Sequence, residues 1–200
     1  MRMDKLVGEL LTLSRLEASP GLARREQLDL SELAHEIAVD ARFEAGPGSP
    51  DVKVDAPGPI VVQGDPDLLW SALENVVRNA MRHGGSGGIV QIIPHADAQH
   101  AHVDVLDRGP GIAPSDLAEV FRPFFRSHPN SVAGHGLGLA IARHVLVAHG
   151  GDIKAANREG GGLRVRLSLP PAALNASGRA SSGGAPCGTP PLRAPGRNAA

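Results

Sequence analysis

The fold of this 200-residue chain is decided by one stretch, Asp65-Pro-Asp-Leu-Leu-Trp-Ser-Ala-Leu-Glu-Asn-Val-Val-Arg-Asn-Ala-Met-Arg-His83. A proline near the start is typical of the first turn of a helix, and the glycines after His83 are typical of a helix end. At 100° per residue, four apolar side chains share one face: Leu69, Leu73, Val76 and Ala80. The stretch therefore predicts a long helix that packs this face on a sheet.

The opposite face of this helix is polar. It gathers four side chains, Asn75, Arg78, Asn79 and Arg82, and the two amides are spaced at i, i+4. Such a strip can bind a hydrated cation and phosphate groups, or it can simply face solvent. The helix alone leaves both interpretations open.

On both sides of this helix the chain alternates between predicted strands and helices, which is typical of an α/β domain. Before the helix we predict a strand at 28–30, a helix capped by Ser31 that runs to about residue 44, and a hairpin of strands 51–55 and 60–63. After it we predict strands at 89–94 and 102–107, a helix at about 136–149, and strands at 152–157 and 162–169.

A second informative stretch, Asp107-Arg-Gly-Pro-Gly-Ile112, follows the strand segment Val103-Asp-Val-Leu. An aspartate at a strand end can accept a hydrogen bond from an exocyclic amine, and the glycines let the backbone approach a planar heterocycle. An ordinary turn uses the same residue types, so this stretch by itself also leaves two interpretations.

A third stretch, Gly134-His-Gly-Leu-Gly-Leu-Ala-Ile-Ala-Arg143, has glycines that lead straight into a predicted amphipathic helix. Free backbone N–H groups and the positive end of the helix dipole meet there, which favours phosphate. The stretch lacks the lysine of a P-loop, and no glycine-rich turn follows the first predicted strand as a Rossmann fold requires. Between the second and third stretches, Phe121-Arg-Pro-Phe-Phe-Arg126 is typical of a hinge beside a mobile lid, of a core anchor, or of both.

In this order and spacing, the four stretches resemble the N, G1, F and G2 boxes of the ATP-binding domain of sensor histidine kinases. The resemblance covers about residues 28–169. It implies an α/β fold, a two-layer α/β sandwich of the Bergerat (GHKL) type, preceded by one helix and followed by a disordered tail. Residues 72–80 and 121–126 most resemble envelope-stress sensor kinases of the Cpx type.

The resemblance also implies a site for ATP and Mg²⁺. In it Asn79 would ligate Mg²⁺, Asn75 would line the same phosphate pocket, and Asp107 would bond to the adenine amino group. The other residues implied to bind the nucleotide are Arg82, His83, Gly109, Gly111, Arg126, Gly134, Gly136, Leu137 and Gly138. The implied reaction is γ-phosphoryl transfer to a histidine, and the implied partners are a cognate response regulator and the dimerisation domain of a full-length kinase.

The two ends of the chain differ from the ATP-binding domain expected at residues 20–169. Residues 1–19 resemble the second helix of a kinase dimerisation domain, and the Pro- and Gly-rich residues 170–200 predict a disordered tail. The family's phosphoacceptor histidine would lie before Met1, so we expect a C-terminal kinase fragment. His35-Glu36 imitates the acceptor dipeptide but lacks the proline that follows it in the family, and we expect His35 to be structural.

Other classes of protein share parts of this pattern. ATP hydrolases of the same superfamily place a glutamate base where this chain has Asn75, and an amide cannot act as a base. An anti-sigma serine kinase would not explain the first helix. A non-catalytic nucleotide-binding or dimerisation module remains an alternative to a kinase whose acceptor histidine is supplied in trans.

Composition excludes several classes. A formal charge of −1 argues against nucleic-acid binding, a single cysteine excludes an internal disulfide, and no run of 18 apolar residues is present to span a membrane. We expect the chain to be cytoplasmic, although full-length relatives are anchored in the cell membrane. His95, His100 and His102 lie near a predicted turn, but no cysteine or ordered acid completes a set, so no metal site is expected there.

Overall fold

The computed structural model describes residues 24–85, 87–127 and 135–172, together with Gly8. The elements along this part of the chain are β1 (Glu26–Asp29), α2 (Leu30–Glu44), β2 (Asp51–Val54), β3 (Val61–Gly64), α3 (Pro66–His83), β4 (Ile89–Ala96), β5 (Ala101–Leu106), two 3₁₀ turns (Pro114–Asp116 and Glu119–Phe121), α4 (Gly138–Ala148), β6 (Asp152–Asn157) and β7 (Leu163–Leu169). Apart from Gly8, the expected first helix lies outside the described residues, as do Gly134 and the expected tail beyond Ala172.

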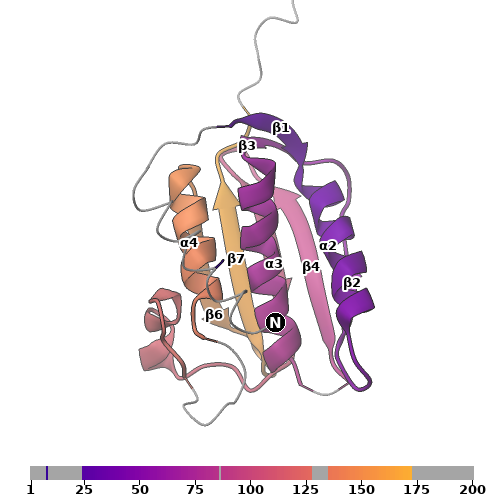
Figure 1. Ribbon diagram of the computed structural model, residues 1–200, viewed down its shortest axis with the longest axis vertical. Coiled ribbons are helices and arrows are strands. Elements are labelled where there is room, and N and C mark those ends of the chain that lie inside the picture. Colours follow the sequence, from indigo (N-terminus) through magenta and orange to yellow (C-terminus); the bar gives the residue numbers. More distant parts are fainter. Residues whose placement is uncertain (1–7, 9–23, 86, 128–134, 173–200) are drawn as a thin grey trace, which may run out of the picture.

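The main sheet has five strands in the order β2-β4-β5-β7-β6. The β2–β4 pair is parallel and the other neighbours are antiparallel. Helices α2, α3 and α4 lie on one face of this sheet, as Figure 1 shows. Alternate residues of the strands turn toward these helices and are buried, among them Val90, Ile92, Val103, Val105 and Val165. The molecule therefore has two layers with one core between them.

Helix α3 packs at the middle of the helical layer (Figure 1). Its bounds confirm the prediction, with Pro66 at the first position and Asp65 accepting hydrogen bonds from the backbone N–H groups of Asp67 and Leu68. The four apolar side chains predicted to share a face are all buried. The polar face is divided, however, because Arg78 turns toward α2 and pairs with Glu44 and Glu74 at 3.0 and 2.7 Å.

The predicted hairpin of strands 51–55 and 60–63 is wrong. Strand β2 pairs with β4 in the main sheet, whereas β3 pairs with β1 in a separate two-stranded antiparallel sheet. Two prolines, Pro57 and Pro59, lie between the two strands, and proline cannot donate a backbone hydrogen bond to a ladder. Val52 and Val62 each bury fully in the core instead of facing each other.

The predicted cap of α2 is also wrong by two residues. Asp29 is the N-cap, and its Oδ1 accepts hydrogen bonds from the N–H groups of Ser31 and Ile60, both at 2.8 Å. The Ser31 hydroxyl instead donates to the carbonyl of Gly58 at 2.6 Å. An aspartate at the end of a strand thus both starts the helix and fastens the chain before β3.

His149, the residue that ends α4, connects that helix to the start of α3. Its Nδ1 lies 2.7 Å from the carbonyl oxygen of Val145, and its Nε2 accepts a hydrogen bond from the N–H of Asp65 at 3.0 Å. The side chain is buried, and this burial lowers the pKa of His149 because it disfavours the charged imidazolium. The neutral ring therefore joins the two helices.

Candidate nucleotide-binding cleft

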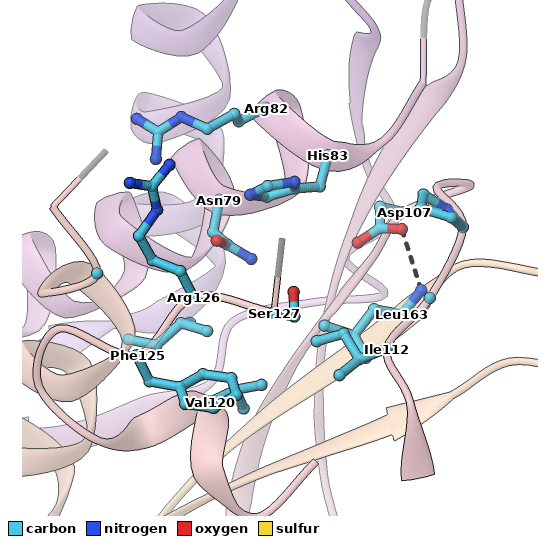
Figure 2. Close-up of a pocket in the computed structure, with 14 residues that line it drawn as sticks. Asn79, Arg82, His83, Asp107, Ile112, Val120, Phe125, Arg126, Ser127 and Leu163 are labelled. Atoms are coloured by element: carbon cyan, nitrogen blue, oxygen red, sulfur yellow. Dashed lines mark hydrogen bonds between the residues drawn. The ribbon is translucent and has the colours of Figure 1, made fainter. Parts of the chain in front are cut away.

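A cleft opens where α3 ends, β5 ends and α4 begins. Figure 2 shows side chains from these elements pointing into it. The residues that line it are Asn79, Arg82, His83, Asp107, Pro110, Gly111, Ile112, Val120, Phe125, Arg126, Ser127, Gly136, Leu139 and Leu163. Seven of the residues predicted from the sequence are among them: Asn79, Arg82, His83, Asp107, Gly111, Arg126 and Gly136.

Asp107 is the acidic group of the cleft and is 4% exposed. Its Oδ1 accepts hydrogen bonds from the N–H groups of Gly109 at 2.8 Å and Leu163 at 3.0 Å. Within the described residues Oδ2 has no hydrogen-bond partner, and Figure 2 shows it turned toward the other lining side chains. The carboxylate is thus held firmly by one oxygen and presents the other as an acceptor.

Gly109, two residues after Asp107, is required because the chain packs closely there. A Cβ on Gly109 would lie 2.1 Å from the carbonyl oxygen of His83, the last residue of α3. Gly109 does not itself line the cleft, and its predicted role in nucleotide binding stays a prediction, but it lets the end of β5 approach the end of α3. This contact brings Asp107 and His83 to the same cleft.

Two arginines lie on the side of the cleft opposite Asp107. Arg82 comes from the last turn of α3 and Arg126 from the segment that follows the second 3₁₀ turn, and in Figure 2 both extend away from Asp107. Asn79, one turn before His83, points between the arginines and the carboxylate. The cleft therefore has a cationic end and an acidic end, joined by neutral polar groups.

An apolar wall, which local motifs did not predict as part of the site, completes the cleft. Ile112, Val120, Leu139 and Leu163 contribute to it. Leu163 begins β7, 56 residues after Asp107, and only the pairing of β5 with β7 brings the two together. Ile112 ends the stretch that begins at Asp107, and Val120 directly precedes the phenylalanine stretch, so the sequence could have indicated both as residues of the site.

The phenylalanine stretch supports the core-anchor interpretation, whereas the lid expected beside it lies largely outside the described residues and stays a prediction. Phe121 is buried in the core, Phe125 lines the cleft, and Phe124 is 62% exposed with a φ of 65°. The N–H of Phe124 donates to the carbonyl of Gly136 at 2.9 Å, and a Cβ on Gly136 would lie 2.6 Å from the carbonyl oxygen of Phe125. The stretch is thus anchored in the core and packed against Gly136, just before α4.

Three other predicted residues lie behind the cleft lining. Leu137 is the N-cap of α4 and is buried in the core. Gly138 begins α4 beside Asn75, because a Cβ there would lie 3.0 Å from the Asn75 Oδ1. The Asn75 Nδ2 donates to the carbonyl of Ser71 at 2.9 Å, which fixes the amide with its oxygen toward the start of α4.

The start of α4 suits an anion. Among the described residues, no side chain caps its first backbone N–H groups. Uncapped N–H groups and the positive end of the helix dipole favour negatively charged groups such as phosphate.

Comparison with known proteins agrees with this geometry. The model of the histidine kinase-, DNA gyrase B-, and HSP90-like ATPase family matches residues 64–173, more than half of the chain. The solved structure of the mycobacterial sensor histidine kinase MprB superposes with a TM-score of 0.65 at 30% identity, covering 74% of this chain and 99% of that one. The chain belongs to this ATPase family and contains the ATP-binding catalytic domain of a sensor histidine kinase.

Two curated relatives give the same assignment. The sensor-like histidine kinase SenX3 of Mycobacterium tuberculosis is 36% identical over 172 residues, which cover 84% of this chain and 42% of SenX3. The sensor histidine kinase CpxA of Escherichia coli is 35% identical over 173 residues, which cover 84% of this chain and 37% of CpxA. The chain thus spans less than half the length of these relatives. Because the two identities are nearly equal, the resemblance to the Cpx type stays a prediction.

The predicted α/β sandwich of the GHKL type is confirmed by these relatives and by the two-layer fold. Among the helices that the structure describes, none combines the length and the apolar character needed to cross a membrane.

Proposed function

We propose that the cleft binds ATP with the adenine at Asp107 and the phosphates at the arginine end, and that the bound ATP phosphorylates a histidine. The observation that supports this best is the Asp107 carboxylate, buried and held by two backbone N–H groups through Oδ1. An acceptor in this position suits the exocyclic amine of adenine, and charge strengthens such a hydrogen bond.

The apolar wall supports the same orientation. Ile112, Val120 and Leu163 offer hydrophobic surface in the same cleft as Asp107, and a planar heterocycle gains free energy by leaving water against such surface. A nucleotide inserted base first places its phosphates away from Asp107. That direction leads toward Arg82 and Arg126.

The cationic end would bind the phosphates. Arg82 and Arg126 can each donate two parallel hydrogen bonds to phosphate oxygens, and His83 lines the cleft beside them. The uncapped start of α4 adds backbone N–H donors. These groups would neutralise the charge of the triphosphate and orient the γ-phosphoryl group, which is the main contribution a protein makes to phosphoryl transfer.

The amides of Asn79 and Asn75 fit a magnesium ion. Mg²⁺ prefers oxygen ligands, keeps several waters, and is commonly bound through one or two protein oxygens together with substrate phosphates. Asn79 lines the cleft, and the Asn75 oxygen is turned toward the start of α4 by its hydrogen bond to Ser71. When bound, the ion would reduce the negative charge on the phosphates.

The acceptor would be a histidine on the dimerisation domain of a full-length kinase, and the phosphoryl group would pass on to a cognate response regulator. His35 is an unsuitable acceptor, because it lies on α2 and does not line the cleft. The division of the chain at residues 19 and 169 also stays a prediction.

The test is a phosphotransfer assay in trans. The full chain is mixed with a separate dimerisation domain that carries its acceptor histidine, and with ATP labelled at the γ-phosphate. We expect label on the acceptor domain with the unmodified chain and a loss of at least about tenfold with Asn79→Ala, because the variant lacks the amide oxygen that would ligate the ion. An acceptor domain without its histidine is the control. Binding of ATP without transfer would instead support the non-catalytic module.

A further inference from the structure

The turn between β4 and β5 gathers a second group of polar side chains, far from the cleft. Asp97, His100 and His102 place one ligand atom each within 4.8 Å of one another. His102 lies near the start of β5 and Asp107 directly follows its end, so about 17 Å of strand separates this group from the cleft. In Figure 1 the arrow of β4 points toward the end of the sheet where the turn lies.

This finding corrects the expectation that no acid accompanies these histidines. Asp97 Oδ1 accepts hydrogen bonds from the N–H groups of Gln99 and His100, both at 2.8 Å. These bonds fold the turn back and aim the other carboxylate oxygen, Oδ2, at His102 Nε2, 3.0 Å away.

The two histidines differ in their freedom to move. His102 is 7% exposed, and its Nδ1 lies 2.9 Å from the Ser168 hydroxyl on β7. His100 and Asp97 are exposed on the turn, and the ring centres of His100 and His102 are 5.8 Å apart. One ligand is thus fixed in the sheet, while the other two can shift toward it.

Ser168 provides the outer partner that a metal-binding histidine needs. Without a metal, Nε2–H of His102 can donate to Asp97 and the serine hydroxyl can donate to Nδ1. With a metal at Nε2, the same hydroxyl can rotate and accept a hydrogen bond from Nδ1–H. Such a partner sets the tautomer and orientation of a metal-binding imidazole.

We propose that Asp97, His100 and His102 form a binding site for a divalent transition metal ion of the zinc type. Two imidazoles and one carboxylate match the ligands that Zn²⁺ takes at about 2.0–2.2 Å, with a water completing four-coordination. Mg²⁺ and Ca²⁺ are poor candidates, because they prefer oxygen ligands throughout. The four-coordinate geometry brings ligand atoms to about 3.4 Å from one another, so the exposed Asp97 and His100 need to move by about 1 Å.

The neighbouring charges leave the site able to accept a cation. Arg166 donates to both oxygens of Asp104 at 2.7 and 2.6 Å and is neutralised by it. His95, whose ring centre is 5.0 Å from that of His102, has its Nε2 3.4 Å from the same Asp104 carboxylate. The net charge of the ligand set with both imidazoles neutral is −1, which favours a divalent ion.

The test is calorimetric titration of the full, chelator-treated chain with ZnCl₂ at pH 7.5, in a Cys187→Ser background that removes the single thiol. We expect one ion per chain. His100→Ala and Asp97→Asn each replace an exposed side chain, so they should leave the fold intact and weaken binding by about tenfold or more. The matched control is His35→Ala, which removes an exposed histidine of α2 that lies outside the group.

The proposed role of Ser168 has its own readout. Ser168→Ala should weaken Zn²⁺ binding by about tenfold, and Co²⁺ in place of Zn²⁺ should show the absorption of a four-coordinate ion in the unmodified chain. Equal affinity of the chain and the Asp97 and His100 variants would overturn the proposal. So would the absence of saturable binding up to about 100 μM, well above the range of structural zinc sites.

Discussion

The two ends of strand β5 carry similar side chains in different surroundings. At one end Asp107 is buried and is held by N–H groups from two separate segments of the chain. At the other end Asp97 is exposed and is held by N–H groups from its own turn. The first arrangement is preorganised before any ligand arrives, whereas the second leaves two of its three ligand groups to be ordered by the ligand. Residue types alone therefore do not define a site, because the rigidity of each carboxylate depends on which segments donate the hydrogen bonds that hold it.

The largest effect should come from substituting Gly109, where the end of β5 packs against the end of α3. Gly109→Ala places a Cβ 2.1 Å from the carbonyl oxygen of His83, so the end of β5 must move away from α3. We expect a loss of about 2–3 kcal/mol in the free energy of unfolding, together with the loss of ATP binding. Urea denaturation and calorimetry measure the two effects. Gly58→Ala is the control, since a Cβ there meets nothing within 4 Å; equal stability of both variants would contradict this account.

A pair of aspartate-to-asparagine substitutions separates the two ends of β5. Asp107→Asn should weaken ATP binding by about 10- to 100-fold, because a charged acceptor contributes about 1.5–3 kcal/mol to a hydrogen bond, and should leave Zn²⁺ binding unchanged. Asp97→Asn should do the reverse. Calorimetry with each ligand on each variant gives four results. If either variant weakened the binding of ATP and of Zn²⁺ equally, the two ends of β5 would be coupled, which would contradict the proposal of two separate sites.

A moderate effect on stability should come from the pair of Asp104 and Arg166 on the outer face of the sheet. Burial alone would raise the pKa of Asp104, but hydrogen bonding and pairing with Arg166 outweigh it and lower that pKa. Arg166→Met leaves this buried carboxylate without its main partner, and we expect a loss of about 2 kcal/mol at pH 7. Arg164→Met, two residues earlier on the same face of β7, is the matched control and should change stability little.

The same variant predicts a pH dependence. A carboxyl with a lowered pKa in the folded state stabilises the fold above its unfolded pKa, near 4, and this stability is lost as the pH falls through the folded value. The difference in unfolding free energy between the unmodified chain and Arg166→Met should therefore shrink below about pH 4. A constant difference down to pH 2 would show that the pair does not set the titration of Asp104.

The smallest effect concerns His149, which joins the end of α4 to the start of α3. Because burial lowers its pKa, the folded chain binds fewer protons than the unfolded chain below pH 6.5. Its stabilising contribution is complete above that pH and is lost as the pH falls toward the folded value, by less than about 1.4 kcal/mol per pH unit. Thermal unfolding from pH 7.5 to 5.5 measures this slope. His149→Gln should flatten it, and an unchanged slope would assign the titration to another group.

Local sequence patterns predicted the parts of this molecule that depend on near neighbours. The period of α3 identified its buried face, and the position of Asp107 after a strand identified the acid of the cleft. The pairing of β2 was predicted wrongly, because a four-residue strand does not specify its partner. Leu163 was missed for a related reason: a contact 56 residues away in the chain leaves no local signal. Asp97 was missed as a partner of the histidines because only the folded turn aims its carboxylate back at His102.

We propose that one cleft binds a nucleotide between Asp107 and the arginine end with the help of Mg²⁺ at Asn79. The most direct test of this proposal is calorimetric titration of the chain with ATP, with and without Mg²⁺, alongside Asn79→Ala and Asp107→Asn. We expect saturable binding that Mg²⁺ strengthens. Asp107→Asn should weaken it in both conditions, and Asn79→Ala should weaken it mainly when Mg²⁺ is present. Binding that is absent from the unmodified chain, or that is unaffected by both substitutions, would contradict the proposal.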